Sequence, residues 1–221
     1  MKTLIKLCSV FALLGFPQVS LGQPIYWLNH MDFLPGNPDV TVSFISNSCP
    51  GGTLNGLRIN ATTTGEVFPV ENKVTKGVPV PPDFLIKGVR VCYFVHETSV
   101  EETFISQIRL SQLGDPPDFA LIRLDDATDL RDAGPTCVNS AETLIDPNPD
   151  GPVGGFDLEG ALRLTLNVNF GNTSDTICLR GVGLILAEPE KGKRCTDGID
   201  NDGDGDTDCA DSDCSKIKSC N

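Results

Sequence analysis

The chain has 221 residues and a formal net charge of -13. This acidic balance argues against nucleic-acid binding, because a phosphate backbone is neutralised by clustered Lys and Arg. The 22 glycines and 16 prolines indicate many turns, and an apolar content of 39% argues against a disordered chain. These values predict one acidic, turn-rich domain with an appendage.

Residues 1–22 have the features of a secretory signal peptide. Two lysines precede an apolar run from Leu7 to Phe16, which is too short to span a bilayer. Small residues close the segment, so we expect cleavage before Gln23. The longest later apolar run is 181–187, so the mature chain is expected to have no transmembrane helix and to be secreted or extracellular.

Removal of this segment changes the charge and the cysteine count. The net charge falls from -13 to -15 with the loss of two lysines, and the 9 cysteines lose Cys8 and become eight. An even number of cysteines in an exported chain indicates a disulfide framework. Four lie in the body, where three pairings are open, and four crowd the C-terminus. The expected disulfide-bonded residues are Cys49, Cys92, Cys137, Cys178, Cys195, Cys209, Cys214 and Cys220.

A small cluster near the mature N-terminus allows two interpretations. Trp27, His30 and Met31 lie within five positions of one another. His and Met bind copper, with the indole packing beside the ion, and this requires His30 to meet Met31 or His96 in space. Alternatively, Trp27 belongs to an N-terminal strand and anchors it to the core.

Residues 23–187 are predicted to form an all-β domain, an antiparallel β-sandwich or jelly roll. Between Ala161 and Phe170 apolar and polar residues alternate, which is the period of a half-buried strand. Other runs rich in Val, Ile, Phe and Thr are separated by turn residues, and no stretch has capped helical periodicity. Those further strands are expected at Pro24–Leu28, Val40–Ser46, Thr53–Ala61, Phe84–Val95, Thr103–Leu110, Phe119–Leu124 and Thr176–Leu186.

The body carries no recognisable catalytic motif. It contains no Gly-x-Ser-x-Gly elbow and no Gly-rich phosphate loop. Asp125 and Asp126 are neighbours, but neighbours in a strand point to opposite faces and do not form an acid–base pair. An extracellular hydrolase that draws its carboxylates from distant strands, with the tail as a stabilising appendage, stays open as an alternative function.

The composition changes after Ala187. Residues 188–194 are polar and are predicted to be a linker. Residues 195–221 contain eight Asp against two Lys, a net charge of -6. One frame matches the ligand spacing of an EF-hand-type calcium loop, with Gly205 at the sharp turn and Asp213 as a spare ligand. The expected metal ligands, at loop positions 1, 3, 5, 7, 9 and 12, are Asp200, Asp202, Asp204, Asp206, Asp208 and Asp211.

Charge repulsion explains why this loop needs a cation. Five carboxylates about 5 Å apart repel by roughly 0.8 kcal/mol per pair in water, or about 8 kcal/mol over ten pairs. A disulfide that closes about 15 residues, such as Cys195 to Cys209, contributes about 3 kcal/mol. Oxygen ligands favour Ca²⁺ over Zn²⁺. We therefore expect Ca²⁺ and two disulfides to form the tail, and the metal-free tail to be mobile.

The segment Cys195–Cys214 resembles a known Asp-rich motif, Cys-x-Asp-Gly-x-Asp-Asn-Asp-x-Asp-Gly-x-x-Asp-Cys-x-Asp-x-Asp-Cys. Secreted bacterial proteins of the MopE-like group carry this metal-binding motif, and every position matches here. The segment is also similar to thrombospondin type-3 calcium repeats and, more loosely, to dockerin loops. The resemblance covers about a tenth of the chain. It implies export, metal binding and a cell-surface or matrix setting.

These features predict a secreted, non-enzymatic, calcium-binding β-sandwich protein that acts in cell-surface attachment or extracellular assembly. The expected partner is a surface glycan or an extracellular matrix or envelope protein. The alternatives are the extracellular hydrolase described above and a copper-binding secreted protein.

Overall fold

The structure is a computed structural model, and the described residues form strands and short 3-10 helices. Among the described residues, no helix has the length and apolar character needed to cross a membrane. The 3-10 helices are η1 (His30–Asp32), η2 (Gly192–Thr196), η3 (Asp208–Ala210) and η5 (Lys218–Cys220). The structure describes residues 24–44, 49, 56–65, 73–78, 84–96, 102–113, 121–140, 161–188, 191–201, 206–211 and 214–220.

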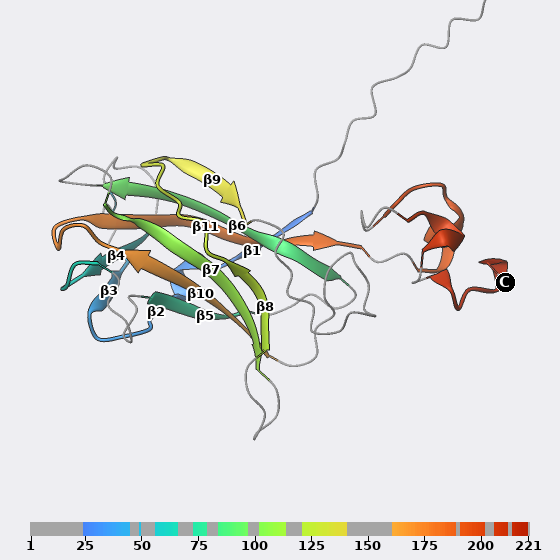
Figure 1. Cartoon of the computed structure of the whole chain (residues 1–221), viewed down its shortest axis with the longest axis horizontal. Coiled ribbons are helices and arrows are strands. Elements are labelled where there is room, and N and C mark those ends of the chain that lie inside the picture. Colours follow the sequence, from blue (N-terminus) through green and yellow to red (C-terminus); the bar gives the residue numbers. More distant parts are fainter. Residues whose placement is uncertain are drawn as a thin grey trace, which may run out of the picture.

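One layer of the molecule, sheet A, contains both the first and the last strand. Its strands are β1 (Ile25–Leu28), β3 (Val40–Ser43), β4 (Leu57–Ala61), β6 (Leu85–His96), β9 (Thr136–Asn139) and β11 (Thr176–Ala187). The order is β3-β4-β11-β6-β9, and β1 also pairs with β11 (Figure 1). β6 pairs along one edge of β11, while β4 and β1 pair with successive stretches of its other edge.

The second layer, sheet B, is formed by β2 (Leu34–Pro35), β5 (Lys73–Val78), β7 (Phe104–Leu113), β8 (Leu121–Asp126) and β10 (Ala161–Asn169). Its order is β2-β5-β10-β7-β8, and the pairings are antiparallel. The alternation predicted for β10 is confirmed, because Leu162, Leu164, Leu166 and Val168 are each at most 1% exposed. These side chains point towards sheet A, while the intervening polar residues face outwards.

The core lies between the two sheets, so the predicted antiparallel β-sandwich is confirmed. Apolar side chains from both layers form one buried cluster, because removing them from water is the main driving force for folding. The inward-facing residues of the two central strands of sheet A are Val89, Val91, Tyr93 and Val95 of β6 and Ile177, Leu179, Val182, Leu184 and Leu186 of β11.

Each strand predicted from the sequence is present within the described residues, with small differences at its ends. The predicted strand positions 45–46, 53–55 and 119–120 lie outside the described residues. The short strands β2 and β9 and the longer strand β5 were not predicted. β5 lacks an apolar alternation because Lys76 occupies an inward-facing position opposite Leu164. The stem of Lys76 is buried and its Nζ reaches Asp32 Oδ2 at 2.8 Å, at the edge of the sandwich.

The eight cysteines among the described residues form four disulfides: Cys49–Cys178, Cys92–Cys137, Cys195–Cys214 and Cys209–Cys220. The first two join elements within the body, and the last two lie within the tail. The pairing of Cys195 with Cys209, considered from the sequence, is therefore wrong. Those two cysteines bond instead to partners nearer the C-terminus, which ties both ends of the acidic stretch to the last residues of the chain.

The body ends where the sequence places its end, because β11 stops at Ala187. The predicted linker 188–194 is not irregular throughout, since η2 begins at Gly192. Arg194 forms an ion pair with Glu188 across this segment. The predicted signal peptide lies outside the described residues, which begin at Pro24.

Candidate functional site

Four of the six predicted calcium ligands lie within the described residues, and Asp202 and Asp204 lie outside them. Asp211 is buried, at 2% exposure, and Asp206 is exposed. Among the described side chains no three His, Cys, Asp or Glu residues are gathered as a metal site. The calcium register, including Asp200 as its first ligand, stays a prediction.

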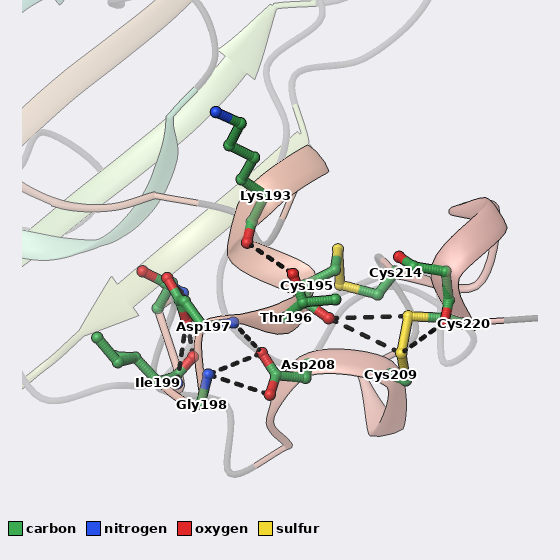
Figure 2. Close-up of a disulfide and its surroundings, with 12 residues drawn as sticks. Lys193, Cys195, Thr196, Asp197, Gly198, Ile199, Asp208, Cys209, Cys214 and Cys220 are labelled. Atoms are coloured by element: carbon green, nitrogen blue, oxygen red, sulfur yellow. Dashed lines mark hydrogen bonds between the residues drawn. A yellow bond between two sulfur atoms is a disulfide. The ribbon is translucent and has the colours of Figure 1, made fainter.

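Hydrogen bonds that Asp208 accepts close the acidic loop at its base. Its Oδ1 accepts from the backbone N–H of Asp197 at 2.9 Å, and both of its carboxylate oxygens accept from that of Gly198 at 3.1 Å (Figure 2). Asp208 has a positive φ of 54°, which short polar side chains tolerate better than others. The carboxylate expected to act through water at position 9 thus also fastens the two ends of the loop together.

The outer face of sheet A carries an exposed tryptophan. Trp27 of β1 is 53% exposed and lies opposite Gly183 of β11. A Cβ atom at Gly181 would lie 3.1 Å from Cζ3 of the indole, and one at Gly183 would lie 2.5 Å from Cγ2 of Ile25 and 3.3 Å from Cε3 of the indole. The absence of side chains at these two positions therefore lets the indole pack against the backbone of β11. The remainder of the ring surface is open to solvent.

Polar groups lie beside this indole on the same face. The register aligns Trp27, Gly183, Arg90 and Asn139 across β1, β11, β6 and β9. Arg90 donates a hydrogen bond to Asn139 Oδ1 at 3.3 Å. An aromatic surface with hydrogen-bonding groups at a fixed distance is the usual composition of a small-ligand site. We call the surface formed by Trp27, Gly181, Gly183, Arg90 and Asn139 the indole platform.

The outer face of sheet B also carries polar side chains, but they bind one another. Arg109 donates to both oxygens of Asp125, at 3.1 and 3.0 Å. Gln107 donates to the same carboxylate and accepts from Asn167 at 2.6 Å. Because their hydrogen bonds are satisfied within the sheet, these four side chains are suited to a structural role. The neighbouring Asp126 is 4% exposed, so the two acids do point to opposite faces, as predicted.

A cavity of about 420 Å³ opens at one end of the sandwich. Its lining includes Glu102, Phe104, Arg131 and Asn169. The guanidinium of Arg131 lies 3.8 Å from the centroid of the Phe104 ring and also pairs with Asp129. The aromatic face in this cavity is thus already covered, whereas the indole of Trp27 is open.

The structure separates Met31 from His96, two of the residues considered for copper. Met31 packs against the core, whereas His96 ends β6 on the outer face, opposite Thr176. Met31 and His96 therefore lie on opposite faces of sheet A. His30 begins η1 beside Met31, so copper binding by these two residues stays a prediction. Of the other interpretation, the N-terminal strand is present as β1, but Leu28, at 5% exposure, and not Trp27 joins the buried cluster.

Sequence reasoning did not find the indole platform, although one signal for it was present. Gly181 and Gly183 alternate within the apolar run of β11. Glycines two apart in a strand share a face, and a strand glycine marks a close approach of another group. The sequence did not show which group approaches these glycines, because that depends on the pairing of β1 with β11.

Comparison with known proteins gives only distant similarities. The chain matches no family model, and no curated protein matches its sequence. Among solved structures, a CBM4 protein covers 59% of the chain and 83% of its own length, at 15% identity and a TM-score of 0.35.

Two further solved structures are similar at the same level. The CBM22-1 xylan-binding domain of Paenibacillus barcinonensis covers 74% of this chain and 96% of its own length, at 10% identity and a TM-score of 0.43. A family 11 carbohydrate-binding module of Clostridium thermocellum, solved with a mixed-linked tetrasaccharide, covers 73% and 95%, at 12% identity and a TM-score of 0.38. Similarities this low do not establish a shared fold or function. The β-sandwich is assigned from the strand pairing within this chain.

Proposed function

We propose that this protein is an exported, non-catalytic glycan-binding domain whose indole platform stacks on a sugar ring, joined to a tail that calcium stabilises. The observation that carries the proposal is the open indole of Trp27, which is 53% exposed and rests on Gly181 and Gly183. A pyranose ring has one apolar C–H face and hydroxyl groups around its edge. An indole beside hydrogen-bonding side chains matches both parts of such a ring.

The adjacent acids of β8, Asp125 and Asp126, give no support to hydrolysis. The carboxylate of Asp125 is bound by Arg109, while Asp126 faces inwards. A glycosidase needs two carboxyl groups that face one another across the scissile bond. The adjacent acids of β8 lie on opposite faces and do not meet this requirement.

The tail proposal is supported by its ligand spacing and by the closure of its ends. Asp208 bonds to Gly198, two residues before the proposed first ligand Asp200, so the first and later ligand positions are held near one another. The two tail disulfides reinforce this closure. Calcium at such a site would stabilise the tail by neutralising its clustered carboxylates.

Replacement of Trp27 tests the glycan-binding proposal. The mature protein should be run in native gels that contain soluble polysaccharides, with neutral and acidic polymers of several backbones. Trp27→Ala should weaken polysaccharide binding by about tenfold or more, because truncation of a tryptophan that the bound ligand covers costs about 2 kcal/mol. The matched control is Leu34→Ala, which removes a side chain that is 62% exposed on sheet B. Equal retardation of Trp27→Ala and wild type, or no retardation of wild type by any polymer, would contradict the proposal.

A further inference from the structure

The outer face of sheet A carries three arginines that have no carboxylate partner among the described residues. Arg58, Arg90 and Arg180 come from β4, β6 and β11, and none of the ion pairs among the described residues includes them. This is unusual for a chain with a net charge of -13, in which acidic partners are plentiful. We call these residues, together with Trp27, the arginine face.

The side chains of these arginines keep most of their donors available. A guanidinium has five N–H donors. Arg58 donates one hydrogen bond to Thr176 Oγ1 at 3.3 Å, and Arg90 donates one to Asn139. Arg180 lies over the ring of Phe94, with its Cζ 5.8 Å from the ring centroid. The Nε atoms of Arg58 and Arg180 are buried and have no acceptor. Because these two Nε–H groups are buried, the donors open to a ligand are on the terminal nitrogens of the guanidinium groups.

The register places all four side chains on one surface. Arg90 lies two strands from Trp27 in the same cross-strand row, a distance of about 10 Å between backbones. Arg58 lies opposite Cys178, and Arg180 occupies the bulge between Leu179 and Gly181. The arginine face therefore extends about 15 Å along the strands, which is the length of several linked sugars rather than of one.

No acidic side chain interrupts this surface within the described strands. The register and the alternation of inward and outward positions identify which residues of sheet A face outwards, and none of those in the described ranges is Asp or Glu. The acidic charge of the protein is carried elsewhere, including the -6 of residues 195–221. At physiological salt the Debye length is about 8 Å, so those distant charges are largely screened at the arginine face.

We propose that the arginine face binds an anionic polysaccharide, with its carboxylate or sulfate groups on Arg90, Arg180 and Arg58 and one sugar ring on Trp27. This inference rests on the proposed glycan binding and names the class of glycan. Arginine pairs with carboxylates and sulfates through its planar fork of donors. A nucleic acid is a poorer fit, because duplex DNA carries one charge per about 1.7 Å, a density that is neutralised by many clustered cations and not by three arginines.

Polymers with a common backbone test this proposal. Hydroxyethyl cellulose is neutral, carboxymethyl cellulose carries carboxylates and cellulose sulfate carries sulfates, so charge is the main difference between them. We expect the mature protein to bind one or both acidic polymers at least tenfold more tightly than the neutral polymer. The preference between the two identifies the acidic group. Rising salt should weaken this binding, because the contacts are ionic.

Variants locate the binding on the arginine face. Arg90→Gln and Arg180→Gln should each weaken binding of the acidic polymer about fivefold or more and reduce its salt dependence, with an unchanged circular dichroism spectrum. The matched control is Arg163→Gln, an exposed arginine on the outer face of sheet B, which should bind as wild type does.

Three outcomes would overturn the inference. The first is equal affinity for neutral and acidic polymers with no effect of Arg90→Gln and Arg180→Gln; loss of binding in Trp27→Ala would then leave the proposed function intact. The second is a single-stranded oligonucleotide that binds as tightly as the acidic polymers, which would indicate general polyanion binding. The third is no binding of wild type to any polysaccharide, which would remove the proposed function as well.

Discussion

Tyr93 links the core of the sandwich to the stability of the protein at high pH. Its side chain lies on β6 and is 1% exposed. Burial, together with the charge of Asp132, raises the pKa of Tyr93 to about 12. In the unfolded chain a tyrosine has a pKa of about 10, so above that pH the unfolded state loses its proton first. The stability from the neutral phenol is therefore present below pH 10 and is lost between about pH 10 and pH 12.

The expected loss of stability at high pH can be tested with Tyr93→Phe. The free energy of unfolding of wild type should fall by about 2 kcal/mol more than that of Tyr93→Phe between about pH 9 and pH 12, because only wild type carries this phenol. Urea titrations at several pH values measure the difference. Parallel pH profiles of the two proteins would show that Tyr93 does not titrate as an isolated buried group.

At the residue scale, the sequence predicted the strand that holds Trp27 but not the face on which the indole lies. A shift of one residue in the pairing of β1 with β11 would turn Trp27 inwards and Leu28 outwards. The register is set by contacts between the two ends of the body, which a local pattern does not contain. The same limit applies to Arg58 and Arg90, whose proximity depends on two different strand pairings.

At the scale of an element, the acidic tail is expected to require calcium. In calcium the segment 195–221 should resist proteolysis, and in chelator it should be cleaved faster, because its carboxylates then repel one another. Calorimetry should detect one site with an affinity of about 10⁻⁴–10⁻³ M. Asp204→Ala should weaken it at least tenfold, whereas Glu190→Gln, just outside the loop, should not. Equal protease resistance in calcium and in chelator would refute the expectation.

Strands were predictable where one face alone was apolar or where an apolar run was long. β10 shows the first case and β11 the second, since β11 is covered on both faces. β5 escaped prediction because Lys76 breaks its alternation, and β9 because it is four residues long and follows a turn-rich segment. The prediction that Asp200 and the aspartates after it are calcium ligands rests on their spacing in the sequence alone.

At the scale of the whole molecule, the two body disulfides should differ in their effect. Cys49–Cys178 spans 129 positions and Cys92–Cys137 spans 45. Loop-closure entropy in the unfolded chain then gives about 5 and about 4 kcal/mol respectively. The double variant Cys49→Ala/Cys178→Ala should therefore unfold at lower urea than Cys92→Ala/Cys137→Ala. The reverse order would show that native-state contacts, not loop length, determine these contributions.

The architecture of the body could be inferred from short strands, turn residues and the lack of helices, whereas its pairing order could not. Which strand neighbours β11 is decided by packing between segments from opposite ends of the domain. The cysteine pairing of the body was open for the same reason, because it depends on Cys92 and Cys137 meeting across β6 and β9.

β11 is the neighbour of β1, β4 and β6, and it is the last strand of the body to leave the ribosome. Until it emerges, a nascent chain holds three strands whose common partner has not been made. Sheet A therefore cannot be completed until β11 is available, and a chain truncated before Thr176 would display three unsatisfied strand edges to any neighbouring polypeptide.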